Sequence, residues 1–100
     1  MRVTIRWSKF ALRERVIIWN QLSNINASAA LNLNTCVERA LRNLRIFPAM
    51  GRLNRASNAR MLIPHKRYRM IYELKESVVT IVSLQNVNRP WPPRDFPFNH

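Results

Sequence analysis

The first residues of the chain alternate between polar and apolar side chains. Within Arg2–Trp7, every second position is apolar, beginning at Val3. A period of two is typical of a strand with one buried face, so a strand is expected there. Ser8 comes next, and serine is a favourable N-cap for a following helix.

Helical periodicity replaces this alternation after Ser8. Lys9–Asn24 contains neither glycine nor proline, and Ala27–Ile46 repeats apolar residues at spacings of three and four. Asn26 is suited to cap the second helix. The short link predicts an antiparallel helix hairpin. Its expected core residues are Ala11, Leu12, Ile18, Trp19, Leu22, Ala30, Leu33, Val37, Ala40, Leu41 and Leu44.

The second half of the chain favours strands. Proline at 48 ends the second helix, because it disfavours helical geometry in the preceding Phe47. Gly51, the only glycine, indicates a tight turn. The segments that follow are a basic loop (Arg52–Asn58), a short strand (Arg60–Ile63), a turn (Pro64–Lys66), a strand (Arg67–Leu74), a hairpin turn (Lys75–Ser77) and a central strand (Val78–Gln85).

These elements predict one α+β domain of order β-α-α-β-β-β over residues 1–92. The helix hairpin should pack on one face of an antiparallel sheet. Four prolines from position 90 onward predict an extended tail over residues 93–100. On the strand at 67–74, Tyr68 and Tyr72 should face the core, while Arg67 and Arg69 face a concave basic surface. Burying those arginines without partners would be costly.

The charge balance points to an anionic partner. The chain of 100 residues has 17 Lys and Arg against 5 Asp and Glu, a net charge of +12. Nine basic residues and no acidic one lie between Arg39 and Arg69. Nucleic acid, a nucleic-acid-containing machine or an acidic protein would neutralise this charge. Neither helix is a clean basic amphipath, so a membrane surface is a weaker candidate.

Other classes of protein are disfavoured by what the sequence lacks. It has no apolar run of membrane-spanning length and no signal-peptide pattern, so a cytoplasmic protein is expected. One cysteine and two histidines exclude an internal disulfide and the familiar structural zinc sites. No Gly-rich phosphate loop or metal-ligand cluster is present, so neither a metal nor a cofactor is expected.

Several short motifs occur in a characteristic order over residues 2–92. They are Trp7-Ser8 followed by Ala11-Leu12, Ile18-Trp19, Phe47-Pro48-x-x-Gly51-Arg52, Arg60-x-Leu62, Tyr68-Arg69-x-Ile71-Tyr72 and Arg89-x-Trp91-Pro92. Together they resemble the RelE/ParE superfamily of bacterial toxins from type II toxin–antitoxin modules. The resemblance implies a toxin that a cognate antitoxin holds inactive.

The resemblance leaves the target of the toxin open. One branch of the superfamily cuts messenger RNA on the ribosome, and another inhibits DNA gyrase; the motifs look more like the gyrase-directed branch. Members often carry Glu where this chain has Met61 and His where it has Asn86. Those departures weaken a conventional acid–base nuclease. They do not exclude ribosome-dependent cleavage, in which Lys, Arg and Tyr can orient and stabilise the reacting groups. A third departure is Arg15, where relatives usually have an apolar residue.

Candidate residues follow from these two targets. For RNA cleavage, the arginines would stabilise the phosphorane and His65 would act as acid or base: the candidate set is Arg60, His65, Arg69 and Arg89. Additional contacts to nucleic acid are expected from Arg52, Arg55, Lys66 and Arg67. The charge favours the ribosome-dependent nuclease, and on this ground we prefer that function. The motifs and the missing acid–base pair favour gyrase inhibition, which is the alternative.

The partner implied by the resemblance is an acidic antitoxin that folds on the toxin, helped by electrostatic steering. Its expected docking residues are Arg13, Arg15, Trp19 and Trp91. A plain RNA-binding module is a third alternative, although the chain lacks an RNP-like aromatic pair and a GxxG loop.

Overall fold

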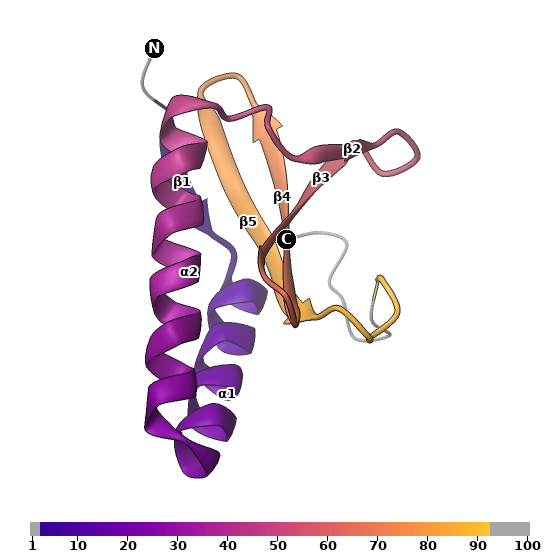
Figure 1. The fold of residues 1–100 in the computed structure, drawn as a ribbon. Helices are drawn as coiled ribbons and strands as arrows, with labels where there is room; N and C mark the ends of the chain where they lie inside the picture. Colours follow the sequence, from indigo (N-terminus) through magenta and orange to yellow (C-terminus); the bar gives the residue numbers. More distant parts are fainter. Residues whose placement is uncertain (1–2, 93–100) are drawn as a thin grey trace.

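The computed structural model describes residues 3–92, which form two helices and five strands. The elements are β1 (Thr4–Trp7), α1 (Lys9–Ile25), α2 (Ala27–Ile46), β2 (Arg52–Asn54), β3 (Ala59–His65), β4 (Tyr68–Lys75) and β5 (Val78–Asn86). The helices lie together on one side of the sheet, and the β2–β3 hairpin extends away from them (Figure 1). The predicted α+β class is therefore confirmed. The expected tail at 93–100 lies outside the described residues.

The sheet has the order β1-β5-β4-β3-β2 and is mixed. β2, β3, β4 and β5 pair antiparallel, but β1 runs parallel to β5, with Thr4 opposite Val78 and Trp7 opposite Ile81. The prediction of an antiparallel sheet was wrong for this one pair. Alternation of side chains reports which face is buried, and it carries no information on the direction of the neighbouring strand.

Both helices begin at the caps that the sequence predicts. The Ser8 side chain accepts a hydrogen bond from the Ala11 N–H at 3.1 Å, and the Asn26 side chain accepts one from the Ser28 N–H at 2.9 Å. Each cap satisfies a backbone donor that has no partner within its helix. Asn26 also ends α1, since its own N–H donates to the Leu22 carbonyl. Asn26 is thus both the C-cap of α1 and the N-cap of α2, and it defines the turn between the two helices.

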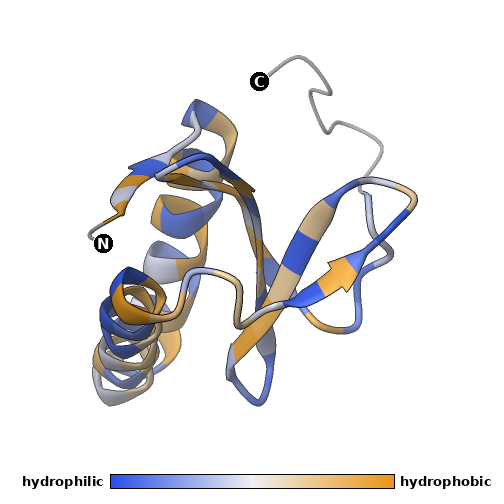
Figure 2. Cartoon of the chain, turned by 90° about the horizontal axis from the view of Figure 1, so that it is seen from above, coloured by the Kyte–Doolittle hydropathy of each residue, from blue (hydrophilic) through white to orange (hydrophobic). Residues whose placement is uncertain are grey.

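The main core lies between the helix pair and the sheet. α2 contributes most of its apolar face, and β4 and β5 contribute Met70, Tyr72, Val79, Ile81 and Leu84. A smaller cluster of Ala59, Ile71 and Val82 lies apart from it, with Phe10, Met61 and Trp91 packed against it. Successive residues of a strand face opposite sides of the sheet, so neighbours such as Met70 and Ile71 join different clusters. Figure 2 shows hydrophobic and hydrophilic residues interspersed along the helices and strands.

Two expected core residues of α1 are on the surface. Leu12 is 47% exposed and Trp19 is 40% exposed. α1 packs against α2 and β5, which bury Ala11 and Ile18 and leave the outer part of its broad apolar face uncovered. The predicted face was therefore wider than the surface available to cover it.

The strand boundaries differ from prediction around the β2–β3 hairpin. Arg52–Asn54, expected in a loop, forms β2 and pairs with residues 59–61. β3 begins one residue before Arg60 and runs through Pro64 to His65. Pro64 lies past the end of β2, in an irregular stretch between Leu62 and His65, where a missing N–H is tolerated.

Candidate functional site

The loop between α2 and β2 is fastened to the sheet by the Tyr72 hydroxyl. This hydroxyl donates to the Pro48 carbonyl at 2.8 Å and accepts from the Gly51 N–H at 2.8 Å. Arg60 Nη1 donates to the carbonyls of Ala49 (3.0 Å) and Gly51 (2.9 Å). The Phe-Pro-x-x-Gly-Arg motif is therefore a loop that a strand tyrosine and a strand arginine hold in place.

Gly51 is required here for close approach, not for an unusual backbone angle. Its φ is not positive, contrary to what a glycine-dependent turn would need. A Cβ at this position would lie 2.7 Å from both Cε1 and the hydroxyl oxygen of Tyr72. Burial raises the Tyr72 pKa, so this hydroxyl stays protonated near neutral pH and is occupied by the loop.

A basic groove lies beside the hairpin that this loop leads into. Its volume is about 530 Å³. Four arginines line it, and Met61, Ile71 and Trp91 add apolar surface. The arginines are Arg52, Arg55, Arg60 and Arg69. Among the described residues that line this arginine groove, none has a carboxylate.

Arg69 connects the arginine groove to the segment after β5. Its Nη2 donates to the Arg89 carbonyl at 2.6 Å. It lies opposite Gln85 in the β4–β5 register, and the buried Gln85 amide accepts from Nε and Nη2 (both 3.1 Å) when its oxygen faces the guanidinium. A buried amide and a backbone carbonyl thus fix the position of this cation.

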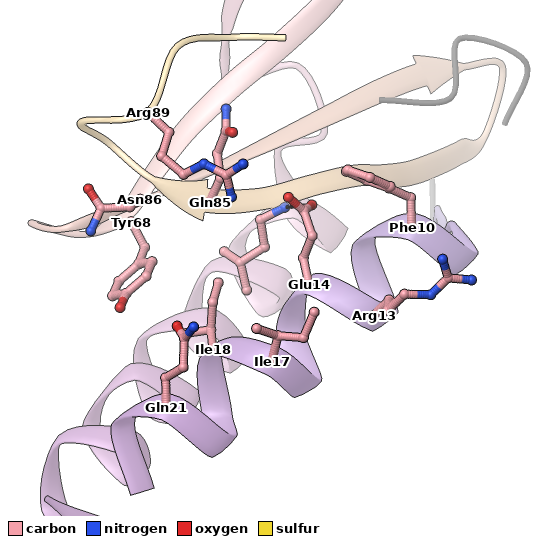
Figure 3. A pocket seen from close by; sticks show the side chains of 11 residues that line it. Phe10, Arg13, Glu14, Ile17, Ile18, Gln21, Tyr68, Gln85, Asn86 and Arg89 are labelled. Carbon is pink, nitrogen blue, oxygen red and sulfur yellow. Dashed lines mark hydrogen bonds between the residues drawn. The ribbon is translucent and has the colours of Figure 1, made fainter. Parts of the chain in front are cut away.

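A second groove, of about 230 Å³, runs between α1 and the end of β5 (Figure 3). Arg13 of α1 and Arg89, which follows β5, both line it. Inside it, Glu14 Oε1 accepts hydrogen bonds from Ser83 Oγ at 2.7 Å and the Leu84 N–H at 2.9 Å. β1 pairs with β5 only as far as Ile81, so Glu14 supplies an acceptor where the neighbouring strand has ended.

A third groove lies between the two helices and is mostly apolar. Val16 and Trp19 line it from α1, and Leu33 and Val37 line it from α2. Arg15 lies at the same groove, but its side chain is occupied. Its Nη2 donates to Asn34 Oδ1 at 2.7 Å and to Glu38 Oε2 at 3.0 Å, and its guanidinium lies 4.8 Å from the Trp7 ring centroid.

His65 lies apart from the arginine groove, at the end of β3. Its Nδ1 accepts from the Arg67 N–H at 3.1 Å, and its ring packs against Tyr68. Partial burial, with the charges of Lys66 and Arg67, lowers the pKa of His65 below its ordinary value of 6.5. The imidazole is therefore mainly neutral at pH 7.

The structure thus separates residues that the sequence grouped. Of the four catalytic candidates, Arg60 and Arg69 share the arginine groove, Arg89 contributes its carbonyl to Arg69 and its side chain to the α1–β5 groove, and His65 lies elsewhere. Arg52 and Arg55 join the arginine groove, whereas Lys66 and Arg67 are exposed at the β3–β4 turn. The four antitoxin candidates divide among three grooves. Arg13 lines the α1–β5 groove, Arg15 and Trp19 line the groove between the helices, and Trp91 lines the arginine groove.

Sequence reasoning missed the roles of Glu14 and Gln85. Glu14 had a usable signal, since it falls on the same helical face as Ala11 and Ile18, three and four residues away. A carboxylate on a buried face needs a hydrogen-bond donor. Gln85 had no comparable signal, because its partner Arg69 is defined only by the cross-strand register.

Comparison with known proteins places this fold in a family. A family model described as "ParE toxin of type II toxin-antitoxin system, parDE" matches residues 5–91. The chain belongs to the ParE toxin family. The predicted RelE/ParE superfamily membership is thereby confirmed, and the family implies an antitoxin as partner.

A solved structure has a similar fold over most of the chain. It is described as "Chromosomal ParDE TA system from P. aeruginosa" and superposes with a TM-score of 0.72 at 14% identity. The alignment covers 86% of this chain and 97% of that one. No curated protein sequence matches the chain. Over residues 3–92, neither helix is long and apolar enough to cross a membrane.

Proposed function

We propose that this ParE-family chain inhibits growth by binding DNA gyrase, and that it does not cleave RNA. The observation that carries the proposal is the composition of the arginine groove. Its ionisable lining residues, among those described, are arginines, and a guanidinium offers hydrogen-bond donors but no acceptor for a proton. His65 lies outside the groove, and the Tyr72 hydroxyl is bound to the α2–β2 loop. This favours a binding surface over an acid–base catalyst.

The test is a supercoiling assay with purified gyrase, relaxed plasmid and ATP. Increasing amounts of the chain should abolish supercoiling, and a preformed complex with its antitoxin should not. A parallel cell-free translation reaction tests the alternative, which is ribosome-dependent cleavage of messenger RNA. In it, 5′ ends are mapped on the messenger with and without ribosomes. Full gyrase activity together with ribosome-dependent cuts would refute the proposal.

Ribosome-dependent cleavage is the second candidate, because two fixed arginines share one groove. Arg60 and Arg69 are each held by backbone carbonyls at that groove. Positioned cations can stabilise a phosphorane without exchanging a proton. The same translation experiment decides it: cuts that depend on ribosomes would support this activity.

For the antitoxin, we propose docking along the exposed apolar stripe of α1. Leu12, Val16 and Trp19 recur at helical spacing and are all exposed. The net charge of +12 favours an acidic partner segment. Arg15 is a poor probe of this surface, since its side chain already joins α1 to Asn34 and Glu38.

Trp19→Ala tests this docking site. A partly exposed tryptophan at an apolar groove is a strong candidate for an interface hot spot, so antitoxin affinity should fall by roughly 30-fold, or about 2 kcal/mol. The measurement is calorimetric titration with the purified antitoxin. Ile25→Ala, at an 83% exposed apolar residue at the end of the same helix, is the matched control and should change little. Equal affinities for the two variants would show that the stripe is not the interface.

A further inference from the structure

We propose that the arginine groove binds single-stranded nucleic acid, with phosphates at its arginine rim and a base against its apolar floor. The proposal begins with the charges at the β2–β3 hairpin. Arg52 and Arg55 are exposed, and within residues 3–92 neither makes a side-chain hydrogen bond or ion pair. Two guanidinium groups without a carboxylate in their groove are suited to bind phosphate.

The other two cations of the groove are already positioned. Arg60 is held through Nη1 by two loop carbonyls, and Arg69 is held by the Arg89 carbonyl and by Gln85. A guanidinium has five N–H donors, so each arginine retains donors after these bonds. Because their positions are fixed before a ligand arrives, less conformational entropy is lost on binding.

The shape and floor of the groove favour a single strand. Its volume of about 530 Å³ lies within the range of pockets that hold small ligands, and is suited to a nucleotide. Met61, Ile71 and Trp91 give it an apolar floor that the small cluster of Ala59, Ile71 and Val82 supports. A cationic rim beside an aromatic residue is the usual arrangement for single-strand binding. Bases stacked inside a duplex would not reach this floor.

The experiment measures fluorescence anisotropy of a short labelled oligothymidine at several salt concentrations. Arg55→Gln should weaken binding roughly fivefold and reduce the slope of log affinity against log salt by about 0.7, the loss of one phosphate contact. Arg42→Gln is the matched control, because it removes the same charge from an exposed position on α2 outside the groove. It should weaken binding less than twofold. Both residues are exposed, so neither variant should impair folding.

Three results would overturn the proposal. Equal weakening by the two variants would show that the net charge alone attracts the oligonucleotide. Arg55-dependent binding of polyglutamate, without binding of oligothymidine, would assign the groove to an acidic peptide. An abasic strand of the same length should bind roughly tenfold more weakly, because it lacks the stacked base. Equal affinity for the two strands would show that no base contacts the apolar floor. Because gyrase is absent from every arm, failure of the gyrase proposal would leave these results unchanged.

Discussion

Replacing Gly51 with alanine should lower the free energy of unfolding by about 3 kcal/mol, since the new methyl group enters an occupied, well-packed site. Its Cβ would meet Cε1 and the hydroxyl oxygen of Tyr72 at 2.7 Å, and Tyr72 is fully buried. Either the ring or the loop must move, and movement breaks the hydrogen bonds to Pro48 and Gly51. Urea unfolding followed by tryptophan fluorescence should show a lower midpoint with an unchanged slope.

A double-mutant cycle with Tyr72→Phe separates the clash from the lost hydrogen bonds. Tyr72→Phe alone should cost about 2 kcal/mol, because the Gly51 N–H and the Pro48 carbonyl lose their partner. In the double variant the hydrogen bonds that Gly51→Ala would break are already absent, although the methyl still meets Cε1. The double variant should therefore be destabilised by less than the sum of the two single changes. Strict additivity, or a Gly51→Ala protein as stable as the parent, would contradict the close approach.

Replacing Glu14 with alanine should lower the free energy of unfolding by about 2–3 kcal/mol, because two donors lose their acceptor. Ser83 is 0% exposed, so its hydroxyl cannot turn to water in place of the carboxylate. The Leu84 N–H would also lose its partner at the point where β1 has ended. Hydrogen exchange at the Leu84 amide should accelerate along with the loss of stability.

Glu14→Gln is the matched control for that change. The amide keeps an oxygen that can accept from the same donors. Glu14→Gln should therefore retain more than half of the stability, and of the Leu84 exchange protection, that Glu14→Ala loses. If Glu14→Ala left exchange at Leu84 unchanged, the carboxylate would not be acting as the acceptor at this edge.

The helices could be predicted closely because their signals are local. Apolar spacing of three and four defines a helical face, and the caps Ser8 and Asn26 act within three residues of themselves. The parallel pairing of β1 with β5 could not be predicted, since it joins segments more than seventy residues apart. β2 was missed because its three residues are all exposed and show no alternation of burial.

The candidate site was predicted by residue type more than by geometry. Their charge marks the arginines at 52, 55, 60 and 69 as candidates, and the four converge on one groove. Which of them are held by carbonyls depends on register and loop path, as the pairing of Arg69 with Gln85 shows. The sequence predicts Trp19 in the core because it shows the width of an apolar face and not how much of that face a neighbour covers.

The attachment of the α2–β2 loop also divides the molecule into parts of unequal local stability. β2 is short and wholly exposed, and the loop before it is tied down chiefly through Tyr72 and Arg60. Opening those few bonds would free the α2–β2 loop and β2, while β3 stayed paired with β4 and the helix–sheet core stayed closed. Such a partly open chain would keep the stripe proposed for the antitoxin, and Arg52 would leave the arginine groove while Arg60 and Arg69 stayed on their strands. The stripe on α1 and the arginine rim at β2 therefore belong to parts of the chain that open at different free energies.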